Sequence, residues 1–233
     1  VLKLTEDVGL ATRDSFPIVR SIVEASINIV FIMAGGRPIA ERAMRHAEQK
    51  SYRDLHRTGA VGKWRIEVKY GGSVPPEHSE RLESLVKEFS TKSGRERRDW
   101  IDASISERLE ASAKRFKAGS ILSLHTAFFG IYRHSSEIVH GTFFGALHLW
   151  GITTPGAKVG TAEDLKNALV TQQESVLSSA IFAYAGLAEC FCQYVEEKEL
   201  EKLVLKELMS LQDLPSIKAA MDAGSDNAPE DYK

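Results

Sequence analysis

The sequence GSILSLHTAFFGIYRHSSEIVHG, at residues 119–141, is the clearest helix signal in this chain. Apolar residues recur through it at helical spacing, and Gly141 is a typical helix stop. Because an α-helix has about 3.6 residues per turn, Arg133, Glu137 and His140 lie on one face, at positions i, i+4 and i+7. The pattern predicts a core helix whose last turns present a cation, a carboxylate and an imidazole together.

A second polar stripe lies upstream, on another apolar segment. Arg20, Glu24 and Asn28 recur at i, i+4 and i+8 within residues 16–33, which are otherwise rich in apolar side chains. Burying such groups without partners is costly, so we expect them to pair with one another or with the helix of residues 119–141. Two interpretations are open. These residues are either a purely structural ion pair with an amide partner, or they support a functional site that they share with the first stripe.

Helical spacing extends over most of the chain. Besides the segment quoted above, helices are predicted at residues 15–33, 38–56, 77–92, 102–116, 161–195 and 198–211. Between residues 59 and 76, apolar residues alternate with charged ones, which is typical of a short strand or extended loop. We therefore expect an all-α, antiparallel bundle of five to seven helices with a short irregular or β-like insertion near residues 60–75.

Three parts are expected along the chain. Residues 1–14 form a lead, residues 15–211 form the helical bundle, and residues 212–233 form a tail. From Gly224 onward the tail is polar and contains a proline, so it has little apolar surface to bury and should be disordered. An aromatic, glycine-rich connection is expected at residues 143–156.

Composition narrows the function classes. A formal net charge of −2 gives no overall attraction to nucleic acid, so binding of a polyanion would need a local basic patch. Several cations between residues 95 and 117 are candidates for such a patch, although charges of this kind are more often a solvated helix face: Arg95, Arg97, Arg98, Arg108, Lys114, Arg115 and Lys117.

Cysteine content and the absence of membrane signals indicate a cytoplasmic protein. Cys190 and Cys192 are two residues apart on a helical segment, which points them to different faces and favours packing over a disulfide or zinc site. No signal-peptide pattern opens the sequence, and charged residues interrupt the longest apolar run. We expect a reducing compartment and no membrane partner.

The common catalytic signatures are absent. There is no G-x-S-x-G or H-E-x-x-H pattern, and the glycine segment at residues 156–161 lacks the lysine of a phosphate loop. Glu137 and His140 form one Glu-x-x-His pair, whereas a di-iron bundle needs two copies and two further glutamates. We therefore expect no metal and no cofactor.

Two interpretations of Arg133 and His140 remain. Cations at a helix C-terminus interact favourably with the helix dipole and cap the last carbonyls. On this interpretation, Arg133 and His140 stabilise the helix and have no further function. The crowding of His134, Ser136 and Glu137 on the same short helix end favours a site instead.

These residues resemble the motif of the HEPN superfamily, the higher eukaryotes and prokaryotes nucleotide-binding domain. That motif has an arginine, a polar residue directly after it, and a histidine after up to six intervening residues; Arg133, His134 and His140 match it here. With the helix that carries Arg20 to Asn28, the motif also resembles an uncharacterised prokaryotic family of this kind, over residues 15–195. Gly141 and Thr142 stand where one HEPN subtype has a tyrosine that is modified.

The resemblance implies a helical-bundle homodimer in which the motifs of two protomers face each other. Active members are metal-independent endoribonucleases, often toxins or antiviral-defence effectors with an antitoxin or defence-system partner. For such chemistry, His140 would act as general base or acid and Arg133 would bind phosphate, while Glu137 would orient His140 and His134 would be a second proton-transfer group. Which histidine is the base stays open. The alternative function is a non-catalytic HEPN-like module that binds a nucleotide or a partner chain.

Overall fold

The chain folds into two compact units. The computed structural model describes residues 9, 11–69, 79–150, 152 and 160–210. Unit 1 comprises residues 1–34 and 105–233, and unit 2 comprises residues 35–104. The predicted extent of the bundle, residues 15–211, stays a prediction. The predicted tail and most of the predicted lead lie outside the described residues.

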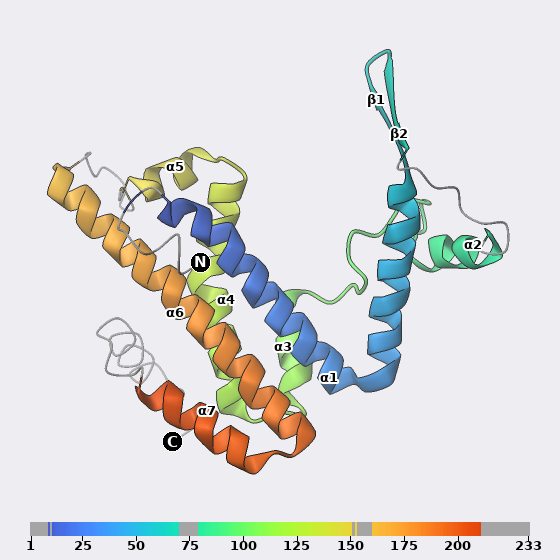
Figure 1. Cartoon of the computed structure of the whole chain (residues 1–233). Helices are drawn as coiled ribbons and strands as arrows, with labels where there is room; N and C mark the ends of the chain where they lie inside the picture. Colours follow the sequence, from blue (N-terminus) through green and yellow to red (C-terminus); the bar gives the residue numbers. More distant parts are fainter. Residues whose placement is uncertain (1–8, 10, 70–78, 151, 153–159, 211–233) are drawn as a thin grey trace. The chain divides into compact units, whose positions relative to one another are not determined.

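Helices dominate the described residues, with one small sheet (Figure 1). The elements are α1 Thr12–Leu55, β1 His56–Val61, β2 Trp64–Lys69, α2 Ser79–Glu88, α3 Ile105–Ala113, α4 Ala118–Val139, α5 Phe143–Leu149, α6 Ala162–Val195 and α7 Lys198–Ser210. The prediction of an all-α bundle with a short β-like insertion is confirmed.

Three details differ from the sequence prediction. The two helices expected at residues 15–33 and 38–56 are the halves of α1, which changes course at Gly36, where φ is 67° and ψ is −155°. A positive φ of this kind favours glycine. The insertion is a complete hairpin, β1 paired antiparallel with β2, rather than one strand. The connection expected after residue 143 contains a short helix, α5, because Thr142 caps its N-terminus by accepting the Gly145 N–H.

The core of unit 1 follows the helical spacing of its sequence. Val19, Val23 and Ile27 from α1 are fully buried, together with Leu124 and Ile131 from α4. Burial of side chains of this size stabilises a fold by about 1.5–3 kcal/mol each. Helix α6 completes this core, and its start is fixed by a capping box between Thr161 and Asp164. The ends of α4 are thereby held in a packed scaffold.

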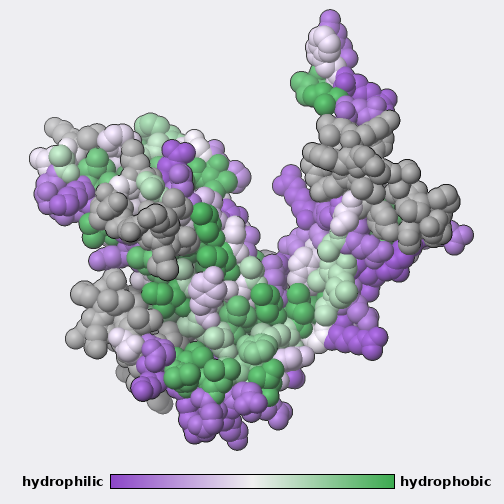
Figure 2. Space-filling view, in the orientation of Figure 1, coloured by the Kyte–Doolittle hydropathy of each residue, from purple (hydrophilic) through white to green (hydrophobic). Residues whose placement is uncertain are grey.

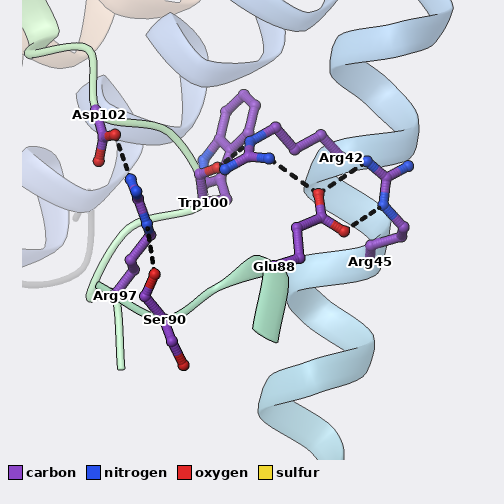
Figure 3. Close-up of polar contacts among 7 residues, drawn as sticks. All are labelled: Arg42, Arg45, Glu88, Ser90, Arg97, Trp100 and Asp102. Carbon is purple, nitrogen blue, oxygen red and sulfur yellow. Dashed lines mark hydrogen bonds and ion pairs between the residues drawn. The ribbon is translucent and has the colours of Figure 1, made fainter. Parts of the chain in front are cut away.

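Unit 2 is held together by an ion-pair network between α1 and α2 (Figure 3). The Glu88 carboxylate accepts hydrogen bonds from Arg42 at 2.9 Å and from Arg45 at 2.9 and 3.0 Å, and the bond from Arg45 lowers the pKa of Glu88. Arg42 also donates to the Trp100 carbonyl at 2.7 Å. Arg97 is paired with Asp102 in the same loop.

Two helical segments, Thr12–Ser51 and Ala162–Val195, are long and apolar enough to cross a membrane by length and composition. Both also contribute buried residues to the core of unit 1, among them Val23 and Val176. A core helix of a water-soluble bundle passes the same test, so these segments do not decide where the protein resides.

Candidate functional site

The candidate site lies at the C-terminal end of α4. Helix α4 ends at Val139, and His140 is its C-cap, with a backbone N–H that donates to the Ser136 carbonyl at 3.0 Å. Gly141 follows with φ at 62°, which ends the helix as the sequence indicates. The imidazole of His140 therefore sits at the junction between α4 and α5.

Three exposed residues of α4 and its exposed C-cap residue lie on one line along the helix, which we call the α4 stripe: Leu122, Phe129, Arg133 and His140. At about 100° per residue, these positions fall within a sector of roughly 40°. Leu122 is 65% exposed and Phe129 is 89% exposed, while Arg133 and His140 are also in the exposed class. The predicted cation and imidazole thus share one accessible face, and apolar side chains continue that face toward the helix N-terminus.

Arg133 lies against an aromatic ring of α5. Its guanidinium carbon is 5.9 Å from the centroid of the Phe144 ring, within the range of a cation–π contact. A guanidinium is charged at any physiological pH. The contact holds a permanent positive charge close to the helix end.

Glu137 braces the turn around His140. Its Oε2 accepts a hydrogen bond from the Thr142 hydroxyl at 2.6 Å, and the Thr142 N–H donates to the Glu137 carbonyl at 3.1 Å. Helix α5 packs so closely here that a Cβ on Gly145 would lie 2.6 Å from the Glu137 carbonyl oxygen. Glu137 therefore fixes the backbone on both sides of His140 and makes no side-chain bond to it among the described residues.

His134 is half-buried and packs against α5. Its ring stacks on that of His148, from α5, with centroids 4.3 Å apart and planes 12° apart. The Nδ1 atoms of both rings are buried and have no hydrogen-bond partner within the part of the chain that the structure describes. Burial is the main cause that lowers the pKa of His134, followed by the charge of Arg133. His134 is therefore neutral at pH 7 and turned away from the exposed α4 stripe.

His148 is a member of this cluster that the sequence interpretation missed. Burial, and next the neighbouring His134, lowers its pKa to about 4. Its ring also meets Phe16 edge-on, with centroids 6.0 Å apart. The sequence signal that could have revealed His148 is Thr142, a residue type that often caps the N-terminus of a helix. A helix that starts at Thr142 places Phe144 and His148 one turn apart on the same face.

The upstream stripe divides between two networks. Arg20 donates to Glu24 at 2.9 Å and to the Tyr132 hydroxyl at 3.3 Å, and its guanidinium lies 4.3 Å from the centroid of the Tyr132 ring. Asn28 instead accepts a hydrogen bond from the buried Arg108 at 2.5 Å. Arg20 thus contacts α4 at Tyr132, which precedes Arg133 in the sequence. Among the described residues, none of Arg20, Glu24 and Asn28 bonds to Arg133 or Glu137.

Three of the seven cations between residues 95 and 117 have a side-chain hydrogen-bond or ion-pair partner within their own unit. Arg108 is buried against Asn28, and Lys117 is paired with Glu201 at 2.7 Å. Arg97 belongs to unit 2, where it is paired with Asp102. Intramolecular carboxylates and an amide therefore bind three of the seven cations.

The groups that could bind a metal or act as nucleophiles are placed as follows. Within the described ranges, no three His, Cys, Asp or Glu side chains are grouped as a metal site requires. Cys190 and Cys192 are both buried, and burial raises the pKa of the Cys190 thiol to about 12. Cys190 is therefore a packed thiol and not a thiolate nucleophile.

Comparison with known proteins adds one match. A protein family described as a family of unknown function (DUF5677) matches residues 9–157 of the chain. That range contains α1 to α5 and all seven candidate residues named from the sequence. No curated protein matches the chain, and no solved structure matches it.

Proposed function

The chain belongs to the family of unknown function DUF5677, and from this premise we propose that it is a metal-independent endoribonuclease of HEPN type. The observation that carries the proposal is the α4 stripe, where Arg133 and His140 are exposed on one face of one helix. The brace between Glu137 and Thr142 keeps the helix end rigid, as a preorganised site requires.

RNA supplies its own nucleophile for such a reaction. The ribose 2′-hydroxyl attacks the adjacent phosphorus, the bond from phosphorus to the 5′-oxygen breaks, and the products are a 2′,3′-cyclic phosphate and a 5′-hydroxyl. Arg133 binds the phosphate oxygens and stabilises the charge that builds up on them. His140 transfers a proton, either from the 2′-hydroxyl or to the leaving 5′-oxygen, because imidazole is the side chain that most often acts as a general acid or base.

One imidazole per protomer leaves one proton-transfer role unfilled. His134 is stacked on His148 and buried at its Nδ1 atom, which argues against contact with substrate. We assign the second role to the His140 of a second protomer. Two histidines then act on opposite sides of one phosphate.

A homodimer built on the α4 stripe would bring these groups together. Leu122 and Phe129 expose large apolar side chains on the same line as Arg133 and His140, and water contact with such a patch is unfavourable. Packing of two α4 helices about a twofold axis buries both apolar pairs and places the two helix ends in one composite site.

The biological setting follows from the HEPN resemblance. The protein would act in the cytoplasm, on cellular or invading RNA, as a toxin or an antiviral-defence effector with an antitoxin or defence-system partner. No cofactor enters the reaction, because the 2′-hydroxyl, one arginine and two histidines supply its chemistry.

One observation favours the alternative, a non-catalytic module that binds a nucleotide or a partner chain. The His140 imidazole has no hydrogen-bond or ion-pair partner in the parts of the chain that the structure describes. A single protomer therefore does not orient this ring. The dimer explains the same observation if the second protomer provides the contact.

The deciding experiment is incubation of purified protein with mixed RNA in excess chelator. We expect cleavage with 2′,3′-cyclic phosphate ends for the wild type and for His125→Ala, a control that removes another histidine of α4. Arg133→Ala and His140→Ala should each abolish cleavage and leave the helical circular dichroism signal unchanged, since both side chains are exposed. Absence of cleavage by the wild type, or equal cleavage by the His140 variant, would support the binding module instead.

A further inference from the structure

The hairpin of unit 2 presents an apolar face that no described residue covers. Strands β1 and β2 are joined at Gly62 and Lys63, and Gly62 has φ at 59°, as tight hairpin turns require. In the register, Val61 is opposite Trp64 and Gly59 is opposite Ile66. Opposed residues of an antiparallel pair share a face and neighbours alternate, so Val61, Trp64 and Ile66 lie on one side.

These apolar side chains are highly exposed. The exposed fractions are 69% for Val61, 71% for Trp64 and 56% for Ile66. All residues from 59 to 67 belong to the exposed class. An isolated two-stranded hairpin is only marginally stable in water, and apolar residues at its tip add nothing to a core. A tryptophan in this position is therefore better explained by a binding partner than by folding.

The charge of the hairpin identifies the partner class. The sequence from residue 56 to 69 has four cations, Arg57, Lys63, Arg65 and Lys69, and one carboxylate, Glu67, whereas the whole chain has a net charge of −2. Lys63 and Arg65 flank Trp64 in the sequence, Lys63 in the turn and Arg65 on the opposite face of the hairpin, and both are exposed. Figure 2 shows hydrophobic and strongly hydrophilic surface side by side on the hairpin. The fitting ligand is a polyanion that also offers flat apolar groups.

Single-stranded nucleic acid has this chemistry. Its bases stack on aromatic side chains without regard to sequence, and its phosphates pair with flanking lysines and arginines. A duplex would hide its bases from Trp64, and an acidic peptide would leave the indole without a stacking partner. We propose that the hairpin at residues 59–67 is a binding site for single-stranded RNA that wraps around the tip of the hairpin. Trp64 stacks on a base, while Lys63 in the turn and Arg65 on the opposite face contact phosphates. The choice of RNA over DNA rests on the proposed function. The inference that the hairpin binds a single-stranded nucleic acid rests on the hairpin's own residues.

The test measures binding separately from cleavage. A fluorescein-labelled single-stranded DNA oligonucleotide, which lacks the 2′-hydroxyl and cannot be cut by the proposed reaction, is titrated with the full chain at several salt concentrations. We expect Trp64→Ala to weaken binding about tenfold or more, and Trp64→Phe to retain most of the affinity. Lys63→Ala with Arg65→Ala should reduce the slope of log affinity against log salt by about 1.4, the value for two phosphate contacts on a single strand.

A matched control removes equal charge elsewhere. Lys166→Ala with Lys206→Ala takes away two exposed cations of unit 1 and should leave affinity and salt slope close to wild type. Equal binding by the wild type and the Trp64→Ala variant would overturn the proposal. So would a loss of dimerisation in that variant with unchanged affinity per dimer, since the hairpin would then be a contact between copies.

The outcome for the hairpin is distinguishable from the outcome for the ribonuclease. If the wild type binds the oligonucleotide through Trp64 but cuts no RNA, the hairpin site stands and the endoribonuclease does not. If RNA cleavage depends on His140 but the Trp64→Ala variant binds the oligonucleotide as well as the wild type, the endoribonuclease stands and the hairpin site does not.

Discussion

The imidazole rings of His134 and His148 stack 4.3 Å apart, one from the candidate motif on α4 and the other from α5. Both rings lie in an environment that disfavours protonation, since burial lowers both pKa values. The helix end that carries Arg133 and His140 thus rests on a pair of neutral rings. Protonation of that pair should loosen it.

The first prediction concerns pH. The folded-state pKa of His148, about 4, is below the value of about 6.5 in the unfolded chain. The unfolded chain therefore binds more protons between these values, and the free energy of unfolding falls as pH drops from about 6.5 toward 4. His148→Phe keeps an aromatic ring and removes this titration, so its urea midpoint should change less between pH 7 and pH 5.

The control for this experiment is Phe144→Leu, which changes the same aromatic cluster without removing a titrating group and should leave the pH slope at its wild-type value. Some slope should remain in the His148→Phe variant, because burial also lowers the pKa of His134 and of His46 in unit 2. Equal slopes in wild type and His148→Phe would contradict the prediction.

The second prediction concerns the brace beside His140. Thr142→Val removes the hydroxyl that donates to Glu137 and caps α5, and loss of such a cap costs about 1 kcal/mol. The turn then moves relative to Arg133, and RNA cleavage should fall at least about tenfold. Thr142→Ser keeps the hydroxyl and should stay near wild type in both urea unfolding and cleavage. Unimpaired cleavage by the valine variant would show that the brace does not position the site.

The third prediction concerns the dimer. Phe129 is 89% exposed on the α4 stripe, so Phe129→Glu should weaken a dimer at least about 100-fold, because two carboxylates would meet at the twofold axis. Cleavage should disappear with the dimer although Arg133 and His140 are intact. Tyr184→Glu, at a 58% exposed site on α6, is the matched control. Light scattering that shows a wild-type monomer at micromolar concentration would argue against the composite site.

The fourth prediction separates Arg20 from Glu24. Their ion pair is partly exposed, so Glu24→Gln should cost about 0.5 kcal/mol or less. Arg20→Ala also loses the contact with the Tyr132 ring and hydroxyl, and should cost about 1 kcal/mol. If Tyr132 transmits this support to Arg133, cleavage at 25 °C should fall for Arg20→Ala in protein that circular dichroism shows to be folded. A change in cleavage that merely follows the melting temperature would make Arg20 structural.

Local signals in the sequence were sufficient to predict the helices and to predict which residues of α4 share a face. The end of α4 at Gly141 and the capping box of Thr161 with Asp164 depend on residues within four positions of each other. The same holds for the shared face of Arg133 and His140, which follows from helix periodicity. Helix α5 was missed because its seven residues are too few for a periodic pattern to show.

Contacts between distant segments could not be derived in this way. Arg20 meets Tyr132 across 112 residues, and Asn28 meets Arg108 across 80, although a sequence stripe had placed Arg20 and Asn28 together. The sequence alone determined which residues form helices and that Arg133 and His140 share a face, because helix geometry repeats every few residues. Only the tertiary structure decided that His134 is buried on His148 and that Glu137 braces Thr142, because those contacts depend on which elements pack against the end of α4.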